Sequence, residues 1–161
     1  MNKQKSIMKK LTAIIVLLLT LGFSTNAMAQ AKGRSAVATP ESKILGRHPL
    51  SLQWISWDYF GSVEVRKENG RLHCIGSQRS KENSDYVIID GYIEMIDALR
   101  FTFTGTIITK IYHINNGQPC IRDGHFEFAS TQGRKYWRLQ QMENPCDGVT
   151  DYVDIYFAKS K

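Results

Sequence analysis

The stretch LRFTFTGTIITKIYH, residues 99–113, decides the fold that the sequence predicts. One parity of this stretch is apolar: Leu99, Phe101, Phe103, Ile107 and Ile111. The other parity is mainly polar: Arg100, Thr102, Thr104, Thr106 and Lys110. Successive side chains of a strand point to opposite faces, so the pattern predicts a long strand with one apolar face. Ile108 and Tyr112 interrupt the polar parity, so the outer face is not expected to be wholly exposed.

Turn signals on both sides of this stretch divide the chain into further strands. Asn-Gly at 69–70 suits a two-residue hairpin, and Asp-Ala at 97–98, Asn-Asn-Gly at 115–117 and Gln-Gly at 132–133 mark other turns. The expected strands cover residues 50–57, 61–67, 71–78, 85–96 and 99–113, the two arms around 132–133, and residues 151–158. Gly91 and Gly105 lie inside these strands and are predicted to mark bulges or bends.

About eight consecutive strands with short connections and no long helix predict an all-β domain over residues 50–161. We favour a single antiparallel up-and-down barrel, lipocalin-like in architecture, because the connections join neighbouring strands and closure removes exposed edges. A two-sheet β-sandwich is the alternative. The first strand lacks a clear Gly-x-Trp motif, so the likeness to lipocalins concerns architecture alone.

Residues 1–29 have the order of features found in a secretory signal peptide. Four lysines precede an apolar segment at 11–23, and Ala-Met-Ala at 27–29 supplies small residues before a cleavage site. The apolar segment has about thirteen residues, fewer than the roughly 20 that span a bilayer, so cleavage is favoured over a membrane anchor. We therefore expect an exported protein, periplasmic or extracellular, without a membrane span once the signal is removed.

The mature chain begins with residues 30–49, which predict a flexible tail followed by a short helix. Thr39 suits the N-cap, Pro40 the first helical position and Gly46 the position beyond the end; a plain loop is the alternative. Removing four signal lysines from 21 basic residues leaves 17 against 15 acidic ones. The remaining Lys and Arg do not cluster, so nucleic acid is not an expected partner.

The arms around Gln-Gly at 132–133 predict one pairing register. Phe128 lies opposite Trp137 and Phe126 opposite Leu139 if the turn occupies two residues. A shift by one residue would set an apolar side chain against a charged one and is therefore disfavoured. The expected register places Phe126, Phe128, Trp137 and Leu139 on the inner face.

The three cysteines divide into a predicted pair and a single thiol. The same register sets Cys120 opposite Pro145, one residue from Cys146, and export permits oxidation, so a Cys120–Cys146 disulfide is expected. Cys74 is then left as a buried thiol. Its alternative role is a nucleophile beside His73, but adjacent strand residues point to opposite faces.

Aromatic residues on the apolar parity supply the main functional hypothesis. They form either an ordinary core or the wall of a cavity for one small apolar ligand, and the ligand-binding candidates are Phe101, Phe103, Phe126, Phe128 and Trp137. The sequence contains no nucleophile–base arrangement, metal-ligand spacing or phosphate loop that we can recognise. We therefore assign no catalytic residue, no metal site and no cofactor.

Three classes of function remain open. A small-molecule-binding barrel is favoured, a protein-interaction or envelope structural module comes second with its partner unknown, and a barrel enzyme of unknown reaction comes third. A large internal void would favour the first class. A filled core with an exposed apolar patch would favour the second, and a cleft with convergent titratable groups the third.

Four segments carry a resemblance to other proteins: HINNGQPC (113–120), RKYWRLQ (134–140), NPC (144–146) and DYVDIYF (151–157). In these segments the chain resembles a family of uncharacterised small exported bacterial proteins. The resemblance covers the C-terminal half or more of the mature chain. It implies no function and no site residues.

Overall fold

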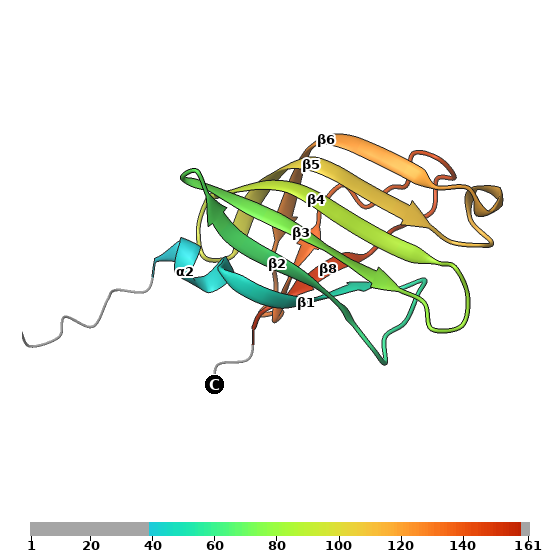
Figure 1. The fold of residues 1–161 in the computed structure, drawn as a ribbon, viewed down its shortest axis with the longest axis horizontal. Coiled ribbons are helices and arrows are strands. Elements are labelled where there is room, and N and C mark those ends of the chain that lie inside the picture. Colours follow the sequence, from blue (N-terminus) through green and yellow to red (C-terminus); the bar gives the residue numbers. More distant parts are fainter. Residues whose placement is uncertain (1–38, 159–161) are drawn as a thin grey trace, which may run out of the picture. The chain divides into compact units, whose positions relative to one another are not determined.

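The computed structural model describes residues 39–158, which form a closed barrel of antiparallel strands (Figure 1). Each strand pairs with the next along the chain, and the first also pairs with the last. The strands are β1 (Gly46–Leu52), β2 (Gly61–Glu68), β3 (Arg71–Arg79), β4 (Tyr86–Met95), β5 (Arg100–Lys110), β6 (Cys120–Ala129), β7 (Tyr136–Leu139) and β8 (Val153–Tyr156). The all-β up-and-down barrel is therefore confirmed over the β-sandwich.

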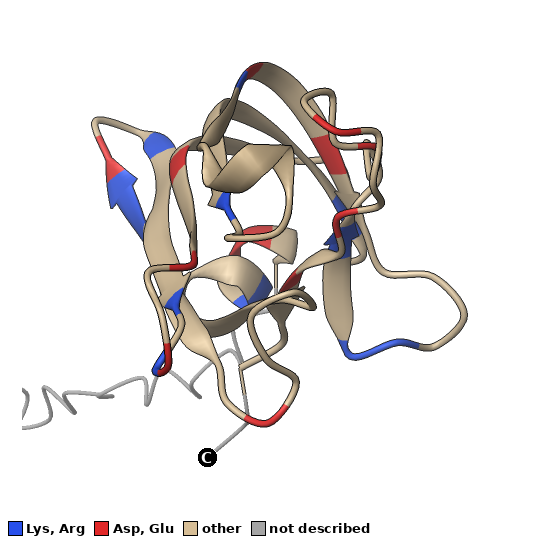
Figure 2. Ribbon diagram, turned by 90° about the vertical axis from the view of Figure 1, so that its right-hand side faces the viewer, with Lys and Arg blue, Asp and Glu red and all other residues tan. Residues whose placement is uncertain are grey.

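The two ends of the barrel differ. The helix α2 (Pro40–Ile44) lies at one end, and the 3-10 turn η1 (Asn115–Gly117) lies in the β5–β6 connection at the other (Figure 1). Figure 2 looks onto this second end, and both acidic and basic residues occur around it. Within residues 39–158, no helix is long and apolar enough to cross a membrane. The predicted signal peptide and the tail up to residue 38 lie outside the described residues.

The short helix α2 forms where the capping residues predict it. The Thr39 hydroxyl accepts a hydrogen bond from the Ser42 backbone N–H at 3.2 Å, and Pro40 occupies the first turn. Ile44 is fully buried in the main core cluster. The ring of His48, which is also buried, contacts the carbonyl oxygens of Ile44 and Tyr156 at 2.8 and 2.9 Å. These contacts connect the helix to β8.

The first strand begins and ends earlier than predicted. It covers Gly46–Leu52, whereas the sequence predicted residues 50–57, and residues 53–55 turn away through a hydrogen bond from Ile55 N–H to Leu52 O. Gly46 and Pro49 disfavour strand structure by local propensity. Pairing with β2 from Gly46↔Val65 to Leu50↔Gly61 nevertheless holds them in the sheet. The barrel therefore begins inside the segment that was assigned to tail and helix.

The bulge predicted at Gly91 does not form, and neither does a bulge at Gly105. The ladder runs without interruption through Gly91, which pairs with Cys74 on one side and Gly105 on the other. A Cβ atom added to Gly91 would lie 2.6 Å from Cζ of Phe103. These two glycines are thus needed because the Phe103 ring passes over their backbone.

The predicted β6–β7 register is wrong by two residues. Phe128 pairs with Leu139, not with Trp137, and Ala129 pairs with Arg138. Gln132 and Gly133 do turn with positive φ (54° and 71°), but the two residues that follow do not pair with β6. A shift of two preserves parity, so Phe128, Trp137 and Leu139 all remain buried on the inner face, with Phe126 partly buried there.

The disulfide between Cys120 and Cys146 is confirmed, and Cys74 is a buried free thiol. The bridge ties the start of β6 to the β7–β8 connection across 26 residues of sequence. Closing a loop of this size restricts the unfolded chain.

We expect the double substitution Cys120→Ser/Cys146→Ser to lower the free energy of unfolding by about 3–4 kcal/mol, because the unfolded chain regains loop entropy. Urea denaturation measures this difference. Adding a reductant should lower the stability of the wild type to that of the variant, and it should not change the stability of the variant. Equal midpoints for the oxidised wild type and the variant would contradict the prediction.

Candidate functional site

The predicted ligand-binding aromatics come together inside the barrel, where they pack against one another. Phe101 and Phe128 stack with ring centroids 5.0 Å apart, and Trp137 meets Phe101 edge-on at 5.8 Å. Phe103 contacts Phe128 and Phe126 at 6.2 Å in each case. All except Phe126 have no accessible surface. A side chain without accessible surface borders no water-sized void, so these rings have the packing of a filled core.

The barrel wall opens between β6 and the chain that follows β7. The two strands pair only through Phe128↔Leu139 and Ala129↔Arg138, and one further hydrogen bond joins Gln140 N–H to Glu127 O at 2.8 Å. Beyond this point the chain leaves β6 and forms the long β7–β8 connection, which is narrowed by an isolated bridge from Glu143 to Thr150.

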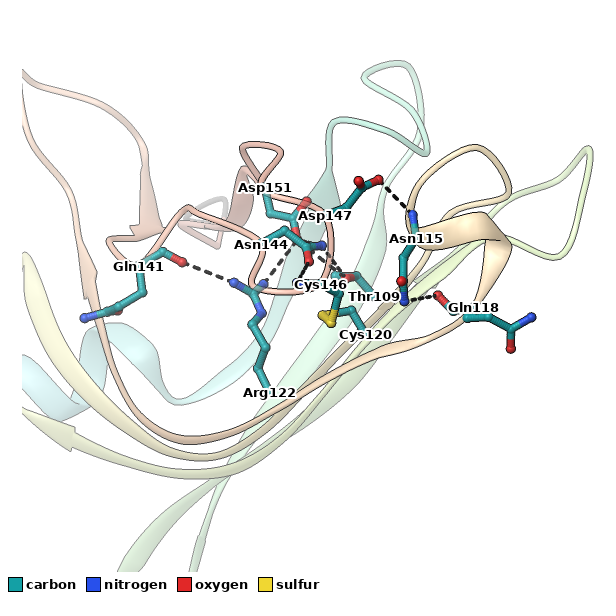
Figure 3. Close-up of a disulfide and its surroundings, with 10 residues drawn as sticks. All are labelled: Thr109, Asn115, Gln118, Cys120, Arg122, Gln141, Asn144, Cys146, Asp147 and Asp151. Carbon is teal, nitrogen blue, oxygen red and sulfur yellow. Dashed lines mark hydrogen bonds and ion pairs between the residues drawn. A yellow bond between two sulfur atoms is a disulfide. The ribbon is translucent and has the colours of Figure 1, made fainter.

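A buried ion pair occupies the inner side of this opening (Figure 3). Arg122, from the inward parity of β6, donates to an oxygen of Asp151 at 3.3 Å and to the Gln141 carbonyl at 3.1 Å. The Arg122 and Asp151 side chains are only 6% and 1% exposed. A charged side chain on an inward strand position destabilises the fold unless it is paired. The ion pair is therefore a structural element of this end of the barrel.

Neutral donors complete the shell around Asp151. The indole N–H of Trp54 donates to one carboxylate oxygen at 3.1 Å, and the side-chain amide of Asn144 donates to the other at 3.0 Å. Burial raises the pKa of the Asp151 carboxyl, while Arg122 and these donors act in the opposite direction. Burial also lowers the pKa of the Arg122 guanidinium. We call Arg122, Asp151, Asn144 and Trp54 the buried polar cluster.

An open cleft of about 390 Å³ lies beside the buried polar cluster. Its walls come from β6 and from the start of the β7–β8 connection, and the lining residues are Ile121, Arg122, Asp123, Phe126, Gln141, Glu143 and Pro145. The Nε atom of Arg122 is buried and has no hydrogen-bond partner within the described residues. The cleft therefore combines apolar side chains with two carboxylates, and its cationic lining residue, Arg122, is paired with Asp151.

An apolar stripe on the outer face leads to this cleft. Ile88 pairs with Ile108 across β4 and β5, and Ile108 pairs with Ile121 across β5 and β6. The first two are half-buried, and Ile121 is 60% exposed. We call these three residues the isoleucine stripe. The interrupted polar parity of residues 99–113 was its signal in the sequence.

A second polar group lies on the outer face of β3 and β4. His73 Nε2 is 2.7 Å from an oxygen of Asp90, and its Nδ1 is 3.2 Å from an oxygen of Glu68. Hydrogen bonding to Asp90 is the main cause that raises the pKa of His73 above its ordinary value of 6.5; burial opposes it, and Glu68 adds to it. The protonated ring is therefore favoured in the folded state.

This arrangement predicts a pH-dependent contribution to stability. The pKa of His73 is higher in the folded than in the unfolded state. His73 therefore stabilises the fold fully at pH values below its unfolded-state pKa, and this stabilisation is lost as the pH rises through its folded-state pKa. We expect His73→Asn to destabilise the protein more at about pH 5.5 than at about pH 8.5. Denaturant titrations at both pH values measure the difference. Asp90→Asn should weaken the dependence, and equal losses at both pH values would contradict it.

Within residues 39–158, no three or more His, Cys, Asp or Glu side chains are grouped so that they could hold a metal ion. Arg122 and Asp151 were not identified from the sequence. Arg122 had a detectable signal, since it lies on the inward parity of β6 together with Cys120 and Phe128. Asp151 had none, because its partner is 29 residues away.

Comparison with known proteins gives one family. The family model described as "PM1083 family" matches residues 27–157. An uncharacterized protein, PM1083, from Pasteurella multocida (strain Pm70) is 44% identical over 156 residues, covering 96% of this chain and 99% of that relative. No solved structure gives a significant match.

Proposed function

The chain belongs to the PM1083 family, and we propose that it is an exported barrel that binds a partner protein through its outer surface. The isoleucine stripe carries this proposal. It joins three adjacent strands into one apolar area that ends at the cleft beside β6. Apolar residues that are contiguous on a surface are typical of interaction sites, whereas single exposed ones are ordinary.

Export rests on two observations. Residues 1–29 have the charged, apolar and small-residue order of a signal peptide. The Cys120–Cys146 disulfide is compatible with an oxidising compartment, where such bridges persist. The expected location is therefore the periplasm or the extracellular space.

Binding of a small apolar ligand inside the barrel is the second candidate. One observation favours it: the indole N–H of Trp137 is buried and has no acceptor within the described residues. The surrounding rings leave no accessible surface, so a ligand would have to displace Phe101, Phe128 or Trp137. Because of this requirement, we favour a partner protein on the outer surface over a ligand in the interior.

An enzymatic role has less support. Burial raises the pKa of the Cys74 thiol to about 12. A reactive cysteine needs an accessible thiolate near neutral pH, so Cys74 fits a structural role in the core.

Photo-crosslinking in the host cell tests the proposed function. A crosslinking residue placed at Ile108 should give an adduct with one defined envelope protein, and the same residue at Glu82, on the β3–β4 connection, should not. The mature protein is titrated in parallel with a fluorescent apolar probe. Absence of a specific adduct, together with saturable probe binding that Trp137→Phe weakens, would favour the interior ligand instead.

A further inference from the structure

The first half of β6, from Ile121 to His125, presents unpaired backbone groups to the cleft. Ser130 N–H bonds to Leu99 O, towards β5, whereas Glu127 N–H and C=O bond to Gln141 and Gln140, away from β5. Backbone groups alternate in direction along an antiparallel strand, so the residues of β6 that share the parity of Glu127 also point away from β5. Those residues are Ile121, Asp123 and His125.

These three residues have no backbone hydrogen bond on that side within the described part of the chain. The facing segment, residues 141–145, lies across the cleft from β6. Among the described residues, the hydrogen bonds between the two each involve one side chain: Arg122 donates to the Gln141 carbonyl, and the Glu127 N–H donates to the Gln141 side chain. An exposed row of strand N–H and C=O groups is a template for another extended chain. Three strand residues span roughly 10 Å.

We propose that the Ile121–His125 edge of β6 binds an extended, basic segment of the partner protein as an added strand. This inference rests on the proposed function and specifies its binding site. Main-chain hydrogen bonds to Ile121, Asp123 and His125 supply affinity in this mode of recognition, and side chains on alternate positions supply specificity. The added strand would lie beside the isoleucine stripe and continue the same outer face.

The charges around the cleft specify the chemistry of the segment. Asp123 and Glu143 line the cleft and are exposed. Arg122 is the cationic residue of its lining, and Asp151 already neutralises it. Lys or Arg side chains on the outward positions of the added strand would therefore meet uncompensated carboxylates.

The inner side of the cleft accepts a different kind of side chain. Phe126, on the inward parity of β6, lines it, and Pro145 adds apolar surface to the cleft. A segment in which apolar and basic residues alternate would satisfy both sides at once, because alternate strand residues face opposite ways.

A capped synthetic peptide of alternating Val and Lys serves as the probe, and titration calorimetry with the mature protein measures its affinity. We expect saturable binding. A control peptide of alternating Val and Glu should bind at least about tenfold more weakly, because the carboxylates of the cleft repel its negative charges. Amide hydrogen exchange should slow at Ile121, Asp123 and His125 when the Val–Lys peptide is bound, because their N–H groups become paired.

Matched variants separate charge from backbone pairing. Asp123→Asn keeps an acceptor for Thr106 but removes the charge, and we expect it to weaken binding about three- to tenfold. Glu82→Gln makes the same charge change on the β3–β4 connection and should leave affinity unchanged. A Val–Lys peptide that is N-methylated on alternate residues keeps its charges but cannot pair along one edge, so one of its two methylation patterns should abolish binding.

Three results would overturn the inference: no binding of the Val–Lys peptide, equal binding of both N-methylated forms, or protection of the same amides by self-association without peptide. Crosslinks from Ile108 that persist in any of these cases would leave the proposed function standing with a different docking site. Loss of those crosslinks as well would reject both.

Discussion

Trp137→Ala is expected to lower the free energy of unfolding by about 3–5 kcal/mol, as large-to-small substitutions of aromatic core residues do. The indole has no accessible surface, and its ring lies 4.4 Å from Phe157 and 5.7 Å from His48. Removing it leaves a cavity among Phe101, His48 and Phe157 that a close-packed interior cannot refill.

Thermal and urea denaturation of the two proteins measure the effect. Trp57→Ala is the matched control, because Trp57 is 51% exposed and its loss should change stability by about half a kcal/mol or less. A Trp137→Ala protein as stable as the wild type would show that the ring is loosely held. It would also favour an internal cavity that binds a ligand.

Asp151→Ala is expected to destabilise the protein by a similar amount, about 3–5 kcal/mol, because it leaves the buried Arg122 guanidinium without its anion. The Gln141 carbonyl remains as an acceptor but carries no charge to balance it. The Trp54 indole N–H loses its acceptor, and the Asn144 amide keeps only the Thr109 hydroxyl, at 3.5 Å, as an acceptor among the described residues.

A double substitution distinguishes this cause from a simple loss of packing. Replacing both partners, Asp151→Ala with Arg122→Met, should recover part of the lost stability, since an apolar pair carries no desolvation penalty. Glu64→Ala, which breaks the exposed pair with Arg66, should have little effect. Losses that simply add in the double variant would contradict the coupling.

The sequence by itself determined the class of fold and, for most strands, which parity of residues faces the core. The alternation over residues 99–113 has a period of two, so it identifies strands and their inner sides without knowledge of their partners. Turn residues such as Asn69-Gly70 determine hairpins locally, and the observed pairing Glu68↔Arg71 follows from them. The Cys120–Cys146 bridge was also within reach, because few cysteines leave few pairings.

The tertiary structure decided what alternation cannot specify. A slip of two residues preserves every face, so the pattern was compatible with Phe128 opposite either Trp137 or Leu139, and only the packing of the whole barrel selects Leu139. Local propensity likewise placed the first strand too late, because pairing with β2 and β8 outweighs Gly46 and Pro49.

The candidate site was also decided at this level. Arg122 and Asp151 meet across a connection of irregular backbone, and the unpaired β6 edge exists because the chain leaves β6 after Gln140. Neither feature has a period or a motif. Both arise from where the last strands of a closing barrel must end, which depends on distances between distant segments and not on neighbouring residues.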